Sequence, residues 1–214
     1  MIRPLSVFSL SLSEVADLVG LEIATDLEIT GVTNKDSEVI PGDLFLAMPG
    51  AKVHGASFAE SALQKGAVAV LTDAQGASMV TSAPVLIVAD VRSSGALIAS
   101  ALYKDPTRDL NSIGITGTNG KTTVTTLLYQ IFQAAGRESG LIGTVDTRIG
   151  SDILPSTRTT PEAADLQALS AAMRERHMRH LVMEVSSHSI SLKRIKGSHF
   201  AIVGFTNLSQ DHLD

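Results

Sequence analysis

The chain has 214 residues, a length that suits one large domain or two small ones. Hydrophobic residues make up 44% and charged residues 18%, and the mean hydropathy is +0.22, a composition that excludes a disordered chain. The net charge is −5, so the molecule lacks the positive field of proteins that bind nucleic acid without sequence preference, and we expect no nucleic-acid partner. Without cysteine, disulfides and thiolate metal sites are excluded, and a reducing compartment is favoured.

The N-terminal segment does not have the pattern of a secretory signal. Serines interrupt its apolar residues, and Glu14 ends the run before any small-residue cleavage site. The longest uncharged stretch, residues 74–89, contains Gly76 and Pro84 and is shorter than the roughly 20 apolar residues that span a bilayer. We therefore expect a soluble, cytoplasmic protein without membrane insertion.

Short apolar runs alternate with helix-like segments through the first half of the chain. The pattern Ser57-Phe-Ala-Glu60 predicts a capping box that opens a helix ending at Gly66, and a strand over residues 67–71 follows. A second strand over residues 85–88 leads to Asp90 as the N-cap of a helix that runs to about Tyr103. This alternation of strands and helices predicts an α/β fold.

The segment Asp105-Pro-Thr-Arg-Asp109 combines proline with charge, and we place a domain junction there, between residues 1–107 and 108–214. The second part predicts strands over residues 112–116 and 141–143, with a helix over residues 121–135 between them. Thr160, Pro161 and Glu162 predict the N-cap, first position and first-turn acid of a helix to about Arg176. Strands over residues 181–185 and 200–206 follow. Because these strands are nearly continuous apolar runs, we expect a mostly parallel, doubly wound sheet buried on both faces by helices.

A glycine-rich segment, Gly114-Ile-Thr-Gly-Thr-Asn-Gly-Lys-Thr-Thr123, lies between a predicted buried strand and a helix. Backbone amides and a helix N-terminus in this setting can hold phosphate. Gly117 and Gly120 allow close approach of the backbone, Lys121 can neutralise the terminal phosphates, and the Thr122 hydroxyl can ligate magnesium. The strict phosphate-loop pattern requires glycine where this chain has Ile115, so the segment is a variant loop. We assign nucleotide binding to the loop residues Gly117, Thr118, Asn119, Gly120, Lys121, Thr122 and Thr123.

The segment Thr116-Gly-Thr-Asn-Gly-Lys-Thr-Thr123 is followed by three further motifs, Thr159-Thr-Pro-Glu162, Met183-Glu-Val-Ser-Ser-His188 and Thr206-Asn-Leu-Ser-Gln-Asp-His-Leu-Asp214. In this order they resemble the motifs of the Mur ligases of peptidoglycan synthesis. Gly31-Val-Thr-Asn-Lys-Asp-Ser37 and Gly42-Asp-Leu-Phe-Leu-Ala47 resemble the uridine-binding N-terminal domain of that family. The resemblance therefore extends over the whole chain.

The resemblance implies a three-domain, ATP-dependent ligase. ATP would phosphorylate the free carboxylate of D-glutamate in UDP-MurNAc-L-Ala-D-Glu, and the amine of a diamino acid, either meso-diaminopimelate or lysine, would attack the acyl phosphate. The implied cofactors are ATP and Mg²⁺, the implied partners are these small molecules, and a monomer is favoured. Positioning and charge neutralisation around the transferred phosphoryl group would be the main tasks of the enzyme.

The resemblance also implies which residues carry the chemistry. Lys121, Glu184 and His212 match catalytic positions of the family, and Thr122, Glu184 and His212 match its metal ligands. From the residues themselves, Glu184 at the end of an apolar strand needs a cation or hydrogen-bond donors, and an ion pair with Lys121 or Arg194 is the alternative to magnesium.

The residues that match substrate contacts of the family are Ser37, Thr159, Thr160, Ser186 and Arg194. Thr160 also suits an ordinary N-cap, and Arg194 could instead belong to a solvated basic face with Lys193 and Lys196. The chain has Glu38 where the family usually has arginine after the Asp-Ser pair.

Two further hypotheses stay open at this point. The chain could be a non-catalytic module that binds nucleotide and UDP-sugar, or it could belong to another ligase of the superfamily, such as a folylpolyglutamate-synthase-like enzyme, which Thr122 disfavours. The sequence stops just past a strand, at Asp214, before the lysine and the C-terminal amino-acid-binding domain of the family. We therefore expect the 214-residue chain by itself to be inactive.

Overall fold

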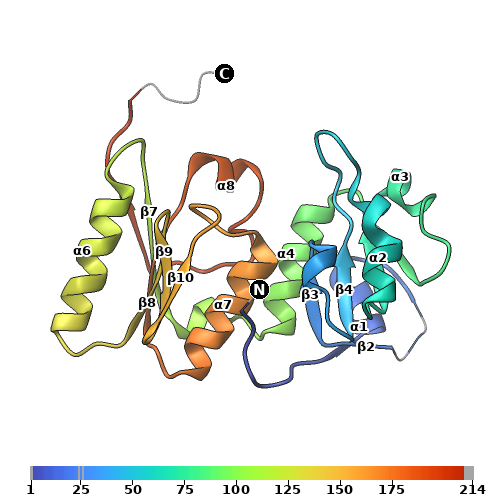
Figure 1. The fold of residues 1–214 in the computed structure, drawn as a ribbon, viewed down its shortest axis with the longest axis horizontal. Coiled ribbons are helices and arrows are strands. Elements are labelled where there is room, and N and C mark those ends of the chain that lie inside the picture. Colours follow the sequence, from blue (N-terminus) through green and yellow to red (C-terminus); the bar gives the residue numbers. More distant parts are fainter. Residues whose placement is uncertain (1, 24, 26, 210–214) are drawn as a thin grey trace. The chain divides into compact units, whose positions relative to one another are not determined.

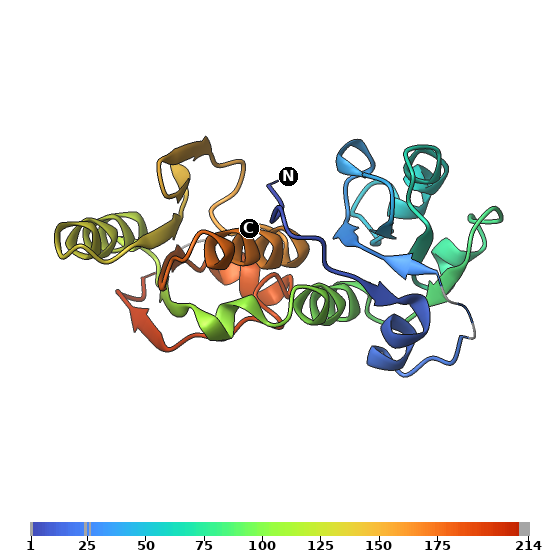
Figure 2. The ribbon, with the colours of Figure 1, turned by 90° about the horizontal axis from the view of Figure 1, so that it is seen from below.

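The computed structural model describes residues 2–209 except residues 24 and 26. The chain forms two compact units, one comprising Val7–Lys104 and the other comprising Ile2–Ser6 together with the chain from Asp105 onward. The division falls three residues before the junction that the sequence suggested. The assignment of Ile2–Ser6 to the second unit was not anticipated: the amides of Leu5 and Ser6 both donate to the Glu175 carboxylate, each at 2.7 Å. In Figure 2 this dark-blue segment lies beside the orange helix that contains Glu175.

The first unit is built on a four-stranded, all-parallel sheet in the order β3-β4-β5-β6. Its strands are β3 (Gly31–Thr33), β4 (Asp43–Leu46), β5 (Ala69–Thr72) and β6 (Val85–Ile87). The helices are α1 (Leu12–Leu18), α2 (Ala59–Gln64), α3 (Ala74–Ala77) and α4 (Val91–Leu102), with 3₁₀ turns at η1 (Asp36–Glu38) and η2 (Gly55–Phe58). A small antiparallel pair, β1 (Leu10–Ser11) and β2 (Glu28–Ile29), completes the unit.

Helices cover both faces of this sheet, as its apolar strands require. Phe45 and Val70 pack with alanines of α2 in one buried cluster. On the other face α4 packs against β4, and a Cβ on Gly95 would lie 2.6 Å from a methyl group of Leu46. A side chain at this position would require Leu46 to shift, so glycine suits the close approach of α4 to β4.

The helix starts of the first unit agree only in part with the local capping patterns. The prediction of Asp90 as an N-cap is confirmed, because its carboxylate accepts a hydrogen bond from the Ser93 amide at 2.9 Å. The capping box predicted at Ser57 and Glu60 is wrong. The chain already turns at η2, where the His54 ring caps the Ala56 amide, and α2 begins two residues after Ser57 without a side-chain cap. An unpredicted capping box joins Ser11 and Glu14 at the start of α1.

The second unit contains a six-stranded mixed sheet, coloured from green to red in Figure 1, in the order β10-β9-β8-β11-β7-β12. The four parallel strands are β7 (Asn111–Thr116), β8 (Ser139–Ile142), β11 (His180–Glu184) and β12 (Ile202–Phe205), and the antiparallel pair is β9 (Asp146–Ile149) and β10 (Asp152–Pro155). The helices are α5 (Pro106–Asp109), α6 (Lys121–Ala134), α7 (Ala163–Glu175) and α8 (Ser187–Ser191).

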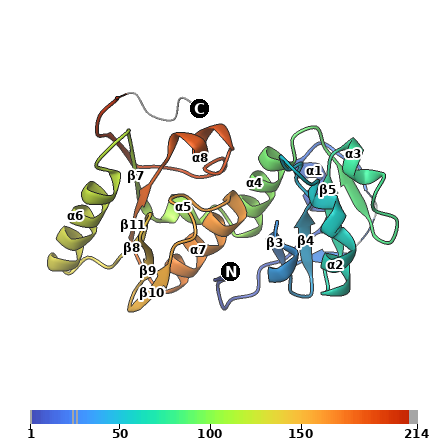
Figure 3. The same cartoon turned by 45° about the horizontal axis from the view of Figure 1, so that its top comes forward.

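Alternate side chains of the central strand β11 point to opposite faces of the sheet. Leu181 and Met183 pack with α7, whereas Val182 packs with Tyr129 of α6. Figure 3 shows the sheet between these two helices. The predicted α/β class and parallel sheet with helices on both sides are thus confirmed.

The edge strand β12 departs from the expectation that every strand is buried on both faces. Its Ile202, Val203 and Phe205 side chains are all exposed. An apolar run therefore predicted the strand correctly but not its burial, because burial depends on what packs against the strand. Among the described residues, no helix combines the length and apolarity needed to cross a membrane.

The Asp90 cap can be tested by substitution. We expect Asp90→Ala to lower the free energy of unfolding by about 1 kcal/mol, because the Ser93 amide loses its acceptor at the start of α4. Asp90→Asn keeps a side-chain acceptor and should stay close to the parent protein. Urea denaturation followed by circular dichroism measures both, and equal stability of the alanine and asparagine variants would contradict the cap.

Candidate functional site

The glycine-rich loop connects the buried strand β7 to the start of α6. Gly117 has φ of +127°, and a Cβ there would lie 2.2 Å from the Thr206 hydroxyl oxygen. Gly120, with φ of +83°, is the N-cap residue of α6. Both positions demand glycine for conformational reasons, and at Gly117 a close neighbour adds a steric reason.

Asn207, just beyond the end of β12, holds the glycine-rich loop in place. The carbonyl of Asn207 accepts from the Thr118 amide at 3.0 Å, and its side-chain oxygen accepts from the Asn119 amide at 3.1 Å. Two loop amides are therefore already bonded. The amides of Gly120, Lys121 and Thr122 have no acceptor within the described part of the chain, so the N-terminus of α6 is the part of the loop able to receive an anion.

Lys121 folds back over this loop. Its ammonium donates to the carbonyl oxygens of Gly117, at 2.7 Å, and Thr118, at 2.9 Å. The lysine also lines a cavity of about 200 Å³ with Ser186, Phe205 and other residues of the same edge. A positive charge thus borders this cavity and belongs to the first residue of α6, whose free amides are close by in the chain, and this combination favours a polyanionic ligand.

Glu184 ends β11 and lies beside the start of α6. Its side chain is buried, with the residue only 1% exposed, and it accepts hydrogen bonds from uncharged donors. The Thr122 hydroxyl donates to Oε2 at 3.0 Å, and the amide of Thr144 donates to Oε1 at 2.8 Å. The alternative ion pair with Lys121 or Arg194 is wrong, since Lys121 contacts loop carbonyls and Arg194 contacts Glu162.

The donor set around Glu184 fits a hard divalent cation. It consists of a carboxylate and a threonine hydroxyl, and magnesium prefers oxygen ligands and completes its shell with water and substrate phosphates. Residues 2–209, apart from the two undescribed positions, contain no group of three or more His, Asp or Glu side chains able to hold a metal. His212, the third ligand expected from the resemblance, lies outside the described residues.

The two adjacent threonines play different structural roles. The buried Thr160 hydroxyl donates to the carbonyl of Glu184 at 2.8 Å and accepts from the Ser186 amide at 3.2 Å. The prediction of Thr160 as an N-cap is therefore wrong: its hydroxyl is used by β11, and Glu162 becomes the residue before α7. Thr159 instead turns its hydroxyl toward that of Thr144, at 3.1 Å.

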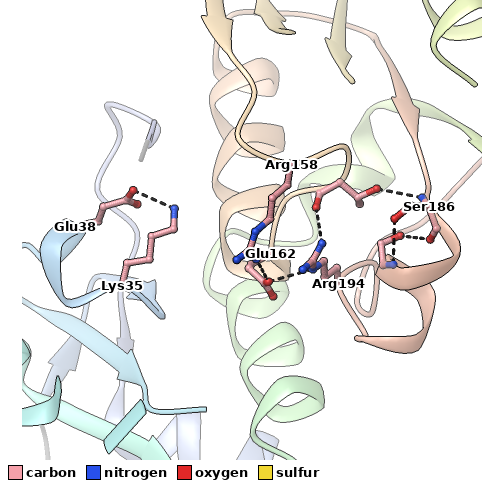
Figure 4. Close-up of polar contacts among 8 residues, drawn as sticks. Lys35, Glu38, Arg158, Glu162, Ser186 and Arg194 are labelled. Carbon is pink, nitrogen blue, oxygen red and sulfur yellow. Dashed lines mark hydrogen bonds and ion pairs between the residues drawn. The ribbon is translucent and has the colours of Figure 1, made fainter. Parts of the chain in front are cut away.

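Arg194 belongs to a partly buried ion cluster (Figure 4). Its Nε lies 3.0 Å from the Glu162 carboxylate, which Arg158 also contacts, and its Nη1 donates to the Thr160 carbonyl at 3.3 Å. Glu162 is 4% exposed and the Arg194 side chain 14% exposed. The alternative of a solvated basic face with Lys193 is therefore wrong, and the guanidinium is oriented beside the threonine loop.

Ser186 opens the short helix α8, where its hydroxyl oxygen accepts from the Ser189 amide at 3.2 Å. The structure therefore brings most of the predicted site residues of the second unit to the carboxyl edge of the sheet. These are Gly117–Thr123, Thr159, Thr160, Glu184, Ser186 and Arg194.

Ser37 belongs to the first unit. It is exposed within η1, next to Asp36, whose carboxylate accepts from Lys65 at 2.9 Å and from Ser61 at 2.8 Å. The hydrogen bond from the Lys65 ammonium, followed by that from Ser61, lowers the pKa of Asp36 below its ordinary value. Glu38, where the resemblance implies arginine, pairs with Lys35 at 3.0 Å (Figure 4).

Sequence reasoning did not select Thr144 as a site residue. It follows β8, and the signal that could have found it is its place two residues after a buried parallel strand, where polar side chains meet at the carboxyl edge. The anchoring of the loop by Asn207 was not predicted either, because it depends on the pairing of β12 with β7.

Comparison with known proteins agrees with this architecture. Residues 28–102 match the catalytic domain of the Mur ligase family, and residues 115–214 match the Mur ligase middle domain. The chain belongs to the Mur ligase family. Over 215 aligned residues it is 48% identical to the UDP-N-acetylmuramoyl-L-alanyl-D-glutamate--2,6-diaminopimelate ligase of Streptomyces avermitilis, and the alignment covers 99% of this chain and 42% of that Mur ligase.

Solved structures of Mur ligases share the fold. A structure of a UDP-N-acetylmuramoyl-L-alanyl-D-glutamate--2,6-diaminopimelate ligase superposes with a TM-score of 0.77 at 26% identity, covering 96% of this chain and 42% of that one. A MurF ligase from Thermotoga maritima in complex with ADP gives a TM-score of 0.56 at 21% identity, covering 83% and 37% of the two chains, which supports the fold alone. The chain thus spans about two fifths of the length of the Mur ligases it matches.

The ion cluster yields a stability prediction. We expect Glu162→Ala to lower the free energy of unfolding of the second unit by about 3 kcal/mol, because the partly buried Arg194 loses its counter-charge. Glu60→Ala, which removes an exposed carboxylate from α2, is the matched control and should change stability by less than about 0.5 kcal/mol. Urea unfolding, followed by hydrogen exchange in peptides from α7 and α2, measures the stability of each unit in both variants. Equal losses of stability in Glu162→Ala and Glu60→Ala would contradict the role of Glu162 as the counter-charge of Arg194.

Proposed function

We propose that this chain carries the UDP-precursor-binding and nucleotide-binding parts of an ATP-dependent ligase that adds 2,6-diaminopimelate to the D-glutamate of UDP-MurNAc-L-Ala-D-Glu. The observation that carries the proposal is the buried Glu184 carboxylate beside Thr122 at the start of the phosphate loop helix. The names of the relatives support the choice of precursor and diamino acid.

In this proposal the two units have different ligands. The first unit, with Ser37 on its exposed 3₁₀ turn, binds the uridine end of the precursor. The second unit binds ATP at the N-terminus of α6, through the free amides and Lys121. The Thermotoga maritima MurF ligase, whose structure holds ADP, supports a nucleotide at such a fold. Selection of the diamino acid belongs to parts of the relatives that this chain does not span.

The reaction begins with a carboxylate, which is a poor electrophile. Transfer of the γ-phosphoryl group of ATP to the D-glutamate carboxylate releases ADP and leaves an acyl phosphate, and attack by the diamino-acid amine then releases phosphate and forms the amide. Lys121 moves from the loop carbonyls to the phosphates and neutralises charge on the transferred group. Arg194, oriented by Glu162, binds a carboxylate of the precursor, while Thr159, Thr160 and Ser186 position the peptide.

Magnesium would be held by Thr122 and Glu184, together with the nucleotide phosphates, and His212 is proposed as a ligand of a second ion. When bound, the metal neutralises phosphate oxygens and holds them in line for transfer. The buried carboxylate with two hydroxyl neighbours is suited to this ion because it is already oriented and needs only to exchange hydrogen-bond donors for a cation.

Nucleotide binding by the chain tests this proposal. We expect the protein to bind ATP in a magnesium-dependent manner. Glu184→Gln should raise the magnesium concentration for half-maximal binding more than about tenfold, because loss of even an outer-shell partner of a metal ligand has an effect of that size. Thr126→Val, further along α6, is the matched control and should leave the midpoint unchanged. Isothermal titration calorimetry measures the midpoints, and magnesium-independent binding in the parent protein would contradict the site.

Substrate choice is tested separately, by protection from proteolysis. Protection by UDP-MurNAc-L-Ala-D-Glu, but not by the corresponding tripeptide precursor or a folate, is the expected result. Protection by the folate alone would identify a folylpolyglutamate-type ligase instead.

A further inference from the structure

Thr144 lies between the proposed metal carboxylate and the proposed substrate loop. It follows β8 at the carboxyl edge of the sheet, next to the strand that ends in Glu184. The residue is exposed, and its amide and its hydroxyl both point to Glu184. Thr144 therefore contacts the carboxylate through backbone and side chain together.

The backbone contact fixes one carboxylate oxygen. The Thr144 amide donates to Oε1 at 2.8 Å, and this bond does not depend on which side chain position 144 carries. A side chain on the preceding residue would displace this oxygen, because a Cβ on Gly143 would lie 2.8 Å from it. Oε1 is thus turned toward the loop after β8, and Oε2 toward the start of α6.

The side-chain contact concerns the other oxygen. The Thr144 hydroxyl lies 3.0 Å from Oε2, which also accepts from Thr122 at 3.0 Å, and 3.1 Å from the Thr159 hydroxyl. A hydroxyl has one proton, so it can donate to Oε2 or to Thr159 but not to both. Donation to the charged oxygen is the stronger bond while Oε2 lacks a cation. A carboxylate oxygen has two lone pairs, so a cation can replace the Thr122 donor while Thr144 keeps its bond to Oε2. The Thr159 hydroxyl can then donate its own proton to the Thr144 oxygen.

We propose that Thr144 is a positioning residue that holds Glu184 for the metal and links the metal site to Thr159 of the substrate loop. The inference rests on the proposed function, because it assumes a nucleotide-bound cation at Glu184 and a substrate at Thr159. It adds a residue and a route: the amide and the hydroxyl of Thr144 orient the two carboxylate oxygens, and the hydroxyl joins Glu184 to Thr159.

The first experiment titrates magnesium against the protein at a fixed ATP concentration, with calorimetry as the readout. We expect Thr144→Val to raise the magnesium midpoint about tenfold, as for other outer-shell partners of metal ligands. Thr144→Ser keeps the hydroxyl and should stay within about twofold of the parent. Thr147→Val removes a hydroxyl from β9, away from Glu184, and is the matched control with an unchanged midpoint. Thr144→Ala repeats the hydroxyl loss without the bulk of valine, and circular dichroism verifies folding.

The outcomes separate this inference from the proposed function. If the parent binds ATP with magnesium dependence and Glu184→Gln weakens it, the metal site stands; an unchanged midpoint in Thr144→Val and Thr144→Ala then overturns the role of Thr144. An equal rise in the serine and valine variants also overturns it, because the hydroxyl would be irrelevant. If the parent itself shows no magnesium dependence, the proposed function fails and this inference falls with it.

The link to Thr159 is tested by a double-mutant cycle on the same midpoint. We expect Thr159→Val to shift the midpoint by about threefold in the parent and to have no effect in the Thr144→Val background, because the two hydroxyls act in series. Additive shifts would overturn the link.

Discussion

The second unit depends on holding one buried carboxylate in a fixed orientation. Glu184 is 1% exposed, and its partners within the described residues are uncharged donors, so hydrogen bonds of good geometry offset the desolvation of its carboxylate. These donors come from the start of α6 and from the loop after β8, which are separated along the chain by more than one element. A shift of either would leave the carboxylate short of partners.

The parallel sheet supplies this arrangement. Because β7, β8 and β11 run in the same direction, their carboxyl ends meet at one edge, and the chain at or just beyond these ends contributes Thr122, Thr144 and Glu184. The Thr160 hydroxyl then joins the threonine loop to the end of β11 by bonding the Glu184 carbonyl and the Ser186 amide. Packing of α6 and α7 on opposite faces keeps the strands in register, and so the edge is a rigid platform for polar groups.

Much of the fold and of the local structure around the candidate site could be predicted from the sequence, because the patterns that specify them lie within short segments. The strand–glycine loop–helix order around Gly117 and Lys121 was predicted from the sequence, and the buried β7, the positive φ of Gly117 and the start of α6 confirm that local structure. Two similar serine patterns show a limit of prediction from local sequence. Ser11 and Ser57 both precede a glutamate by three residues, yet only Ser11 forms a capping box, because His54 has already capped a turn that includes Ser57.

The sequence by itself determined the alternation of strands and helices, the glycines of the loop and the acid at the end of β11, since these follow from periodicity, φ angles and burial within short segments. Only the tertiary structure decided the partners of the polar groups. It paired Arg194 with Glu162 rather than Glu184, used the Thr160 hydroxyl for β11 rather than α7, and placed Thr144 against Glu184, 40 positions away. Hydrogen bonds and ion pairs act over a few ångströms in space, whatever the separation along the chain, so residues distant in sequence compete for them only once the sheet has brought them together.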